Sequence, residues 1–290
     1  MAVVFMQKKS IYALICFVAA GIVSACGSSG SEPGGSVNPS VASITSGAVM
    51  YSKQSSFTVS GVALKDATVT VSGACSALQE QAGGTSLSRT FSCTPSSVGS
   101  VTIAVTSGGT VLTQEPFTVP NPHVTIITSK GTIVVELDPV KAPKTVYNFL
   151  LYVNDGYYSN TTFHRVVFDF VVQGGGFGID GVAKPASHPT LELEPPSLTG
   201  LTNSQGTIAM ARSTPLNSAT SQFYFNTVDN NPNTGTNNAG TNLDIPAGQG
   251  YAVFGKVIQG LEIVKAIEVV PVTGSVPTTP VILTSASQTL

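Results

Sequence analysis

The sequence YSNTTFHRVVFDFVVQGGGF, residues 158–177, is the most aromatic and β-branched run of this chain, and it contains one arginine, Arg165. These residue types favour β-strands, and the three consecutive glycines indicate a tight turn. An arginine buried among phenylalanines and valines is costly unless its guanidinium is paired or kept for a ligand. The alternative is an ordinary strand arginine whose stem packs while its head reaches solvent. Chemistry alone leaves both interpretations open.

The composition of the 290-residue chain indicates a β-rich protein that acts outside the cytoplasm. Hydrophobic residues make up 42% of the chain, Gly and Pro are abundant and Trp is absent, which allows two packed, turn-rich domains. Charged residues make up only 10% and the formal net charge is -2, so the chain lacks the basic surface that nucleic acid requires. We therefore expect partners that are recognised by shape and hydrogen bonds.

Residues 1–25 predict a bacterial lipoprotein signal peptide. Two lysines precede the apolar run 11–23, which is short for a membrane span, and small residues precede Cys26. The segment VSAC resembles the site at which the cysteine is lipidated and becomes the new N-terminus; an ordinary secretory signal is the alternative. Because Gly27 rather than aspartate follows the cysteine, this resemblance favours a lipid anchor in the outer membrane, facing the periplasm.

Two segments follow the predicted anchor. Residues 26–40 consist mainly of Gly, Ser and Pro, and this composition predicts a flexible tether. Residues 41–119 contain several runs in which apolar and hydroxyl side chains alternate, with glycines at turn spacing between them. This pattern predicts a small β-sandwich of the immunoglobulin-like kind, although the usual core Trp is missing. No residue of this module suggests chemistry, so we interpret it as a spacer or a binding platform.

Cys75 and Cys93 are the cysteines that remain after the signal peptide and the lipidated position are set aside. In an oxidising periplasm we expect them to form a disulfide. A metal site or a catalytic thiol pair is disfavoured, because the two cysteines lack CxxC spacing and a nearby histidine.

The second domain is predicted to span residues 123–290, after a boundary marked by closely spaced prolines. Residues 124–137 predict a β-hairpin around a Ser-Lys-Gly turn. Residues 142–154 have apolar side chains at helical spacing, which predicts an amphipathic helix that ends near Gly156.

Several separated segments of this domain carry a family resemblance. They are ELDP (136–139), APKTVYNFL (142–150), GYY (156–158), TFHRV (162–166), FVVQGG (170–175), GTIAMAR (206–212), SATSQFY (218–224) and YAVFGKV (251–257). In this order they resemble the cyclophilins, a family of peptidyl-prolyl cis-trans isomerases, and most closely the bacterial secreted type. The resemblance implies a mainly β fold: a closed eight-stranded antiparallel barrel capped by two helices, the second over residues 261–267.

The resemblance also implies a catalytic site, which we can compare with what the reaction needs. Rotation about an X-Pro bond is opposed by roughly 18–20 kcal/mol of barrier, and lowering it requires no nucleophile, metal or cofactor. A catalyst must hold the proline ring and favour the twisted amide. Arg165 matches the catalytic arginine of the family, Phe170 the aromatic floor of the proline pocket, and Gln173 the glutamine that orients the arginine and the substrate backbone.

Further positions are implied to bind substrate. They are His164, Val171, Met210, Ala211, Arg212, Gln222, Tyr224, Leu243 and Tyr251. The sequence departs from the family pattern at a polar insert, residues 231–241, and at Asn242, where a tryptophan is usual. Tyr224 stands where phenylalanine is more common, and Tyr251 where many members have histidine. We expect these departures to affect the affinity for the drug cyclosporin more than the isomerase activity.

Other ionisable residues have plainer interpretations. Glu192 and Glu194 alternate before two prolines and are interpreted as a solvated strand face rather than a catalytic carboxylate pair. His123, His164 and His188 are too scattered for a metal site or a catalytic triad, and His164 by its own chemistry favours a buried structural hydrogen bond.

The sequence therefore predicts a monomeric, membrane-tethered prolyl isomerase that assists the folding of extracytoplasmic proteins. Its expected partners are proline-containing polypeptides, and no cofactor, metal or nucleic acid is expected. The alternative is a scaffold lipoprotein that uses the same fold to bind partners with little turnover.

Overall fold

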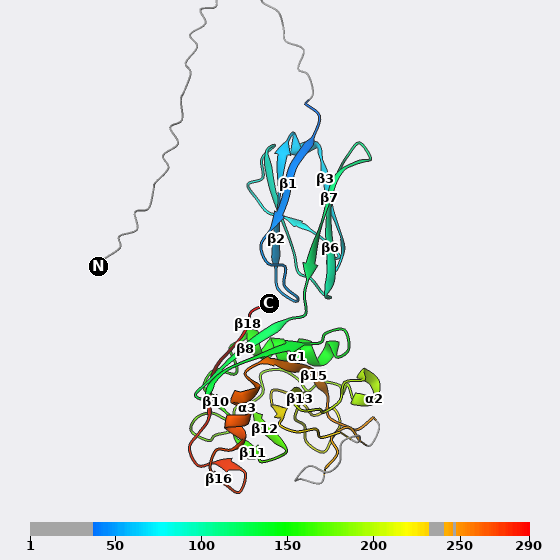
Figure 1. Ribbon diagram of the computed structural model, residues 1–290. Helices are drawn as coiled ribbons and strands as arrows, with labels where there is room; N and C mark the ends of the chain where they lie inside the picture. The colour runs from blue at the N-terminus through cyan, green and yellow to red at the C-terminus, as the bar shows by residue number, and fades with distance from the viewer. Residues whose placement is uncertain (1–36, 232–240, 246–247) are drawn as a thin grey trace, which may run out of the picture. The chain divides into compact units, whose positions relative to one another are not determined.

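The computed structural model describes residues 37–231, 241–245 and 248–290, and most of their regular structure is antiparallel β-strand (Figure 1). The signal peptide, Cys26 and the tether up to residue 36 lie outside the described residues, so these assignments stay predictions. Over the ranges given above, no helix is long and apolar enough to cross a membrane. The residues Val37–Leu290 form one compact unit.

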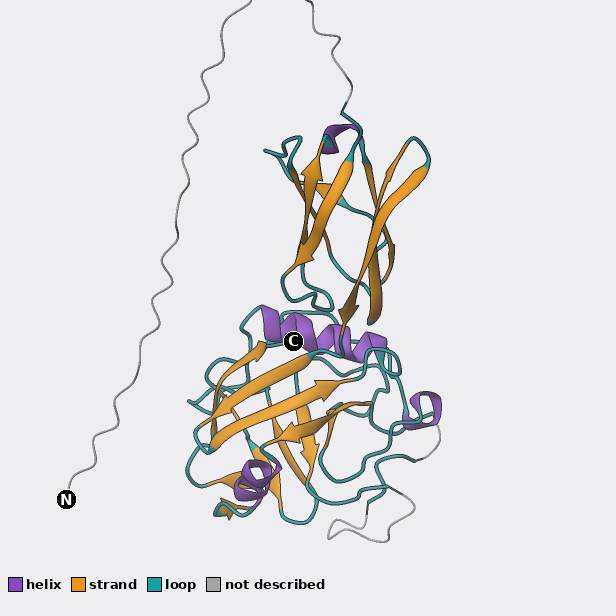
Figure 2. Cartoon of the chain, turned by 45° about the horizontal axis from the view of Figure 1, so that its top comes forward, coloured by secondary structure: helices purple, strands orange, loops and turns teal. Residues whose placement is uncertain are grey.

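The first module consists of two sheets that share a buried interior (Figure 2). One sheet has the order β1-β2-β5-β4 and the other β3-β6-β7. The strands are β1 (Ser40–Ser46), β2 (Ser55–Val62), β3 (Thr68–Gly73), β4 (Gln79–Glu80), β5 (Ser88–Cys93), β6 (Gly99–Ser107) and β7 (Thr110–Val119), with a short 3-10 helix, η1 (Leu64–Asp66), after β2. Alternate side chains such as Phe57 on β2 and Ile103 on β6 are fully buried. The ring of Phe57 meets that of Phe117, on the other sheet, at 5.2 Å between centroids. The alternation of apolar and hydroxyl residues thus gives each sheet one buried face.

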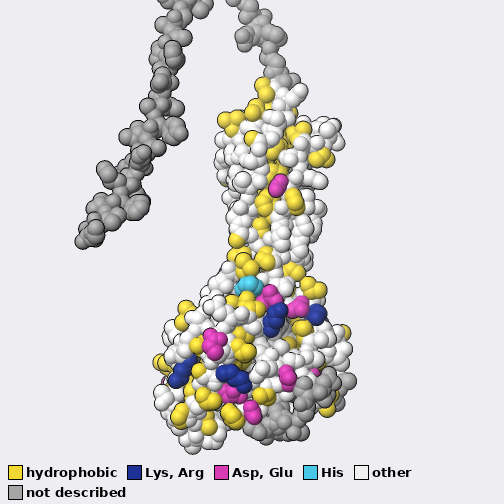
Figure 3. Space-filling model, in the orientation of Figure 1, with side chains coloured by type: hydrophobic (Ala, Val, Ile, Leu, Met, Phe, Trp, Pro, Cys, Tyr) yellow, Lys and Arg dark blue, Asp and Glu magenta, His cyan; other side chains and the backbone are white. Residues whose placement is uncertain are grey.

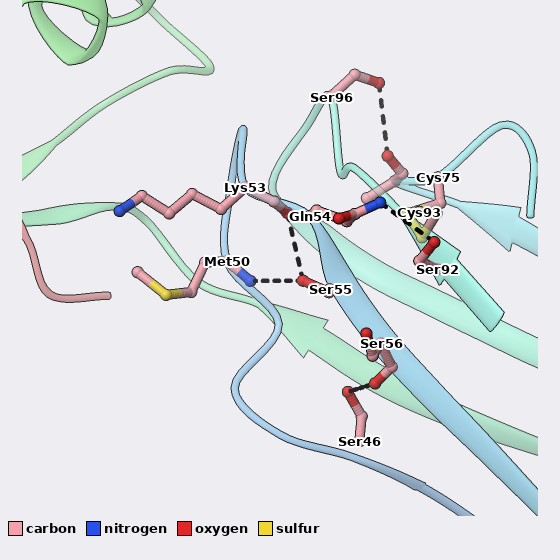
Figure 4. The surroundings of a disulfide bond; sticks show 11 residues. Ser46, Met50, Lys53, Gln54, Ser55, Ser56, Cys75, Ser92, Cys93 and Ser96 are labelled. Carbon is pink, nitrogen blue, oxygen red and sulfur yellow. Dashed lines mark hydrogen bonds between the residues drawn. A yellow bond between two sulfur atoms is a disulfide. The ribbon is translucent and has the colours of Figure 1, made fainter. Parts of the chain in front are cut away.

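A disulfide joins Cys75 and Cys93, as the sequence predicts (Figure 4). The two Cα atoms lie 6.2 Å apart, and both side chains are buried. Cys93 ends β5, whereas Cys75 follows β3 in the other sheet, so the bond ties the two sheets together. Around it, the Gln54 amide donates to Ser92 Oγ at 3.3 Å.

The surface of this module is nearly uncharged. Residues 41–119 include three basic and three acidic side chains, and Arg89 donates two hydrogen bonds to Glu80, each 2.8 Å long. On the face drawn in Figure 3, charged side chains are scarce over this module and more frequent over the domain that follows. The module therefore offers a partner mainly hydroxyl groups and apolar side chains.

The second module is organised around a nine-stranded antiparallel sheet. Its order is β10-β18-β8-β9-β15-β13-β14-β12-β11. The strands are β8 (His123–Thr128), β9 (Gly131–Leu137), β10 (Thr161–Thr162), β11 (Arg165–Val167), β12 (Val171–Gly174), β13 (Thr207–Met210), β14 (Phe223–Asn226), β15 (Val253–Gln259) and β18 (Ile282–Gln288); a separate small hairpin contains β16 (Val272–Thr273) and β17 (Val276–Pro277). The predicted hairpin is present as β8 and β9, paired through the turn at Gly131.

The strand count differs from the expected eight for a local reason. Within residues 158–177, β10 and β11 stand at opposite ends of the strand order and are separated only by Phe163 and His164. At the break, Thr162 N donates to the Phe177 carbonyl and Phe163 N to the Val281 carbonyl. These bonds lead the backbone away from a single ladder, so β10 pairs with β18 and β11 pairs with β12.

Among the residues that the structure describes, three α-helices accompany the sheet, and two of them match the predicted positions. Helix α1 (Pro143–Asn154) buries Val146, Phe149 and Val153 and contacts β18 (Figure 2). Helix α3 (Leu261–Glu268) buries Val264 and Ile267 and contacts β9 and β11. The short helix α2 (Pro196–Thr199) was not predicted.

The interpretation of Glu194 as part of a solvated strand face is wrong. Its side chain is buried, and its carboxylate accepts hydrogen bonds from Thr145 N at 2.8 Å, Thr145 Oγ1 at 2.6 Å and Lys144 N at 3.2 Å. The N-cap residue of α1, Ala142, has no side chain that could satisfy these amides. Glu194 therefore caps α1 from a distant part of the sequence, while Glu192 stays exposed and pairs with the Lys144 ammonium.

Candidate active site

Four neighbouring strands bring most of the predicted site residues around one pocket of about 350 Å³. Arg165 on β11 lies opposite Gln173 on β12, and Gln173 lies opposite Tyr224 on β14. The pocket is lined by Arg165, Phe170, Val171, Gln173, Ala211, Arg212, Tyr224, Thr241, Leu243 and Tyr251. Strand register thus brings Arg165, Gln173 and Tyr224 together, and the same pocket contains Tyr251, 86 residues after Arg165 in the sequence.

Arg165 reaches this pocket because strand side chains alternate. Val166 is buried in the core, so its neighbour Arg165 points to the opposite face of β11. The guanidinium Nη1 donates to Gln173 Oε1 at 3.3 Å, and Gln173 Nε2 in turn donates to Gln222 Oε1 at 2.9 Å. Within the described ranges Arg165 forms no salt bridge. Its charge is thus oriented by neutral amides and stays available at the pocket.

The floor of the pocket is apolar. Phe170, Val171, Tyr224 and Leu243 are all less than one tenth exposed and belong to one hydrophobic cluster. The Arg165 guanidinium carbon lies 5.8 Å from the centroid of the Phe170 ring. The pocket therefore combines an apolar floor, on which a small ring can pack, with a permanently charged donor at its side.

A buried polar network lies beneath this floor and was missed from the sequence. The Tyr224 hydroxyl donates to Asn203 Oδ1 at 2.7 Å, and Asn203 Nδ2 donates to Asp244 Oδ1 at 2.7 Å. Burial is the largest of the effects that raise the pKa of Tyr224 well above 10.0, so its hydroxyl stays protonated. The sequence does contain a signal for this network. Tyr224 stands where phenylalanine is usual, and a buried tyrosine needs a hydrogen-bond acceptor for its hydroxyl.

A second, polar pocket of about 260 Å³ adjoins the first. It is lined by Gln173, Ala211, Arg212, Ser213, Ser218, Thr220 and Gln222. Gln222 can approach the backbone here because residue 176 is glycine; a Cβ at that position would lie 2.5 Å from the Gln222 side chain. The glycine run thus makes room for a site residue, while Gly175 adopts a φ of 81°.

Two predicted substrate contacts lie elsewhere. Met210 is 1% exposed and packs in the main hydrophobic core rather than in the pocket. His164 lines a separate apolar pocket with residues such as Phe177 and Val276, and its ring lies 4.4 Å from that of Phe177. Burial is the main cause that lowers the pKa of His164 below 6.5.

No potential metal site stands out. Across residues 37–231, 241–245 and 248–290, no group of three or more His, Cys, Asp or Glu side chains is close enough to hold an ion.

A family model and curated relatives indicate what this chain is similar to. The family model described as cyclophilin type peptidyl-prolyl cis-trans isomerase/CLD matches residues 123–288. Peptidyl-prolyl cis-trans isomerase A of Dickeya dadantii is 42% identical over 172 residues, which cover 57% of this chain and 83% of the relative. The isomerase cyp18 of Streptomyces antibioticus is 45% identical over 165 residues, covering 55% and 93%. A crystal structure of a Cryptosporidium parvum cyclophilin type isomerase is 27% identical, covers 59% of this chain and 98% of its own, and has a TM-score of 0.45.

Proposed function

This chain belongs to the cyclophilin type peptidyl-prolyl cis-trans isomerase family, and from that premise we propose that it assists the folding of extracytoplasmic polypeptides by isomerising their X-Pro bonds. The expectation of a cyclophilin type isomerase is confirmed by the family match. The observation that carries the proposal for the site is the pocket in which Arg165 stands beside the buried ring of Phe170.

The apolar floor holds the substrate in this proposal. The proline ring packs on Phe170, Tyr224 and Leu243, which fixes the position of the prolyl amide. Because these side chains are already packed and buried, little conformational entropy is lost when the ring enters. The residues on either side of the proline then lie along Ala211 and Arg212.

Arg165 lowers the rotational barrier. In the planar amide the nitrogen lone pair is delocalised into the carbonyl, whereas in the twisted amide it is localised and can accept a hydrogen bond. A guanidinium placed at this nitrogen therefore stabilises the transition state more than the ground state, and only such a difference accelerates the reaction. Gln173 keeps the guanidinium in place through its amide oxygen. No covalent bond is made or broken.

We extend the proposal to the rest of the chain. Cys26 is lipidated and tethers the protein, as a monomer, to the outer membrane facing the periplasm; the VSAC segment and the Gly, Ser and Pro composition of residues 26–40 support this. The module of residues 41–119 is immunoglobulin-like, supported by its two facing sheets and the disulfide between them. The nine-stranded sheet is a closed barrel of eight strands if β10 and β11 count as one interrupted strand.

An isomerase assay with purified protein tests the role of Arg165. Cis-trans exchange of an Ala-Pro peptide is measured for the wild type, Arg165→Ala and the control Lys256→Ala, whose side chain is exposed and lies outside the pocket. We expect a loss of about 100-fold or more for Arg165→Ala, the usual effect of removing one transition-state donor, and none for the control. Equal activity of the wild type and Arg165→Ala would refute the assigned role. A wild type without activity would favour the scaffold alternative.

A further inference from the structure

The two arginines at the pocket keep their full positive charge. Arg165 donates to the neutral amide of Gln173. Arg212 donates through Nη1 to the Ser213 carbonyl at 3.0 Å and through Nη2 to the Gln249 carbonyl. Throughout the described part of the chain neither arginine has a carboxylate within salt-bridge distance. Within these ranges the hydrogen bonds of both guanidinium groups that are given above go to neutral amide and carbonyl groups.

The described side chains that line the site are neutral apart from the two arginines. Of the described residues that line the two adjoining pockets, none is Asp or Glu. The sequences of residues 232–240 and 246–247 contain no Asp or Glu. Asp244 is 7% exposed and is directed to the buried Asn203, beneath the pocket floor. Among the described side chains that line the two pockets, the charged ones are therefore the guanidinium groups of Arg165 and Arg212.

Arg212 lies where it can contact the substrate residues next to the proline. It lines both the proline pocket and the polar pocket beside it, and its guanidinium carbon lies 4.6 Å from the centroid of the Tyr251 ring. The stacking and the two carbonyl bonds hold the guanidinium in place, so little side-chain entropy is lost when a ligand binds it. A side chain of the client that enters the polar pocket meets this guanidinium among hydroxyl and amide groups.

We infer that the isomerase favours polypeptides with an aspartate or glutamate directly before or directly after the isomerised proline, and that Arg212 selects them. This inference rests on the proposed function of the same pocket. The Arg212 guanidinium is partly exposed, so water and salt weaken its attraction to a carboxylate of the client. An exposed ion pair of this kind corresponds to a preference of about 2- to 5-fold for the acidic polypeptide. The preference falls with ionic strength, because the Debye length shrinks from about 10 Å at 0.1 M salt to about 3 Å at 1 M.

The test uses peptides that differ in one side chain. The peptides have blocked, uncharged ends and carry Glu, Gln or Lys directly before or directly after the proline. Exchange is followed by NMR, so that no helper protease contributes its own sequence preference. The readout is the ratio of kcat/KM for Glu to kcat/KM for Gln within each protein, which cancels any general loss of activity. The proteins are the wild type, Arg212→Gln, the conservative Arg212→Lys and the control Lys256→Gln, which removes a cation outside both pockets.

We expect a Glu to Gln ratio of about 2 to 5 for the wild type in at least one of the two positions, with Lys below Gln. The ratio should fall to about 1 in Arg212→Gln and at high salt, stay above 1 in Arg212→Lys, and be unchanged in Lys256→Gln. Equal rates for Glu, Gln and Lys peptides in both positions would overturn the inference while leaving the isomerase function intact. Absence of acceleration for every peptide would instead overturn the function on which it rests.

Discussion

Replacing Glu194 by glutamine should destabilise the second module, because a buried carboxylate is the cap of helix α1. The variant keeps the shape of the side chain but loses the charge that accepts hydrogen bonds from the backbone amides of Lys144 and Thr145 and from the Thr145 hydroxyl. A hydrogen bond to a charged group contributes roughly 1.5–3 kcal/mol, and a charge at a helix N-terminus about 0.3–1 kcal/mol more. Because the amide oxygen of glutamine can still accept one bond, we expect a net loss of about 2 kcal/mol.

Urea unfolding and calorimetry measure this effect. A loss of about 2 kcal/mol corresponds to a fall of roughly 4–8 °C in the Tm of a domain of this size. Glu192→Gln is the matched control, since it makes the same change two residues away on a side chain that is 66% exposed and pairs only with the Lys144 ammonium. An exposed pair of this kind contributes about 0–1 kcal/mol. If the two variants unfold at the same urea concentration, distant capping by Glu194 is refuted.

Three further predictions concern the pocket floor, the disulfide and His164. Tyr224→Phe should lower the free energy of unfolding by about 1–2 kcal/mol in urea, because Asn203 Oδ1 loses its hydroxyl donor; an unchanged midpoint would contradict this. Reducing the Cys75–Cys93 bond should destabilise the first module by about 3 kcal/mol in calorimetry and leave kcat/KM unchanged, since neither cysteine lines the pocket. Burial holds the pKa of His164 below 6.5, so the unfolded chain binds a proton at this site first as the pH falls. Stability measured against pH should therefore decrease below about pH 6.5, and His164→Gln should lose that part of the decrease.

The proximity of Arg165, Phe170 and Gln173 in one pocket could be predicted because it depends on regular strand geometry. Arg165 and Gln173 belong to one short stretch of sequence, and a tight turn between two adjacent strands brings them into register. Phe170 lies in the connection between those strands. The family resemblance identifies these residues, and the pairing of the two adjacent strands then places their side chains close together.

The remainder depends on contacts that no local pattern encodes. Glu194 reaches a helix that begins about 50 residues earlier, and Asn203 meets Asp244 41 residues later. Met210 was assigned to the pocket, but alternation along β13 directs it to the core. The split between β10 and β11 follows from hydrogen bonds to Phe177 and Val281, which are remote in the sequence. Such pairings can be identified only from the folded structure, in which segments that are distant in the sequence lie close together.

The hydrogen bonds around Asn203 also mark a place where this protein can be lengthened. Asn230, just before the polar insert, receives the amide of Leu243 on its carbonyl at 2.8 Å, and its own amide donates to the Asn203 carbonyl at 2.7 Å. These two bonds tie Asn203, Asn230 and Leu243 to one another through residues on both described sides of the insert. We therefore expect that a reporter peptide or a small domain inserted between residues 231 and 241 leaves Leu243 on the pocket wall and leaves kcat/KM for an X-Pro peptide unchanged.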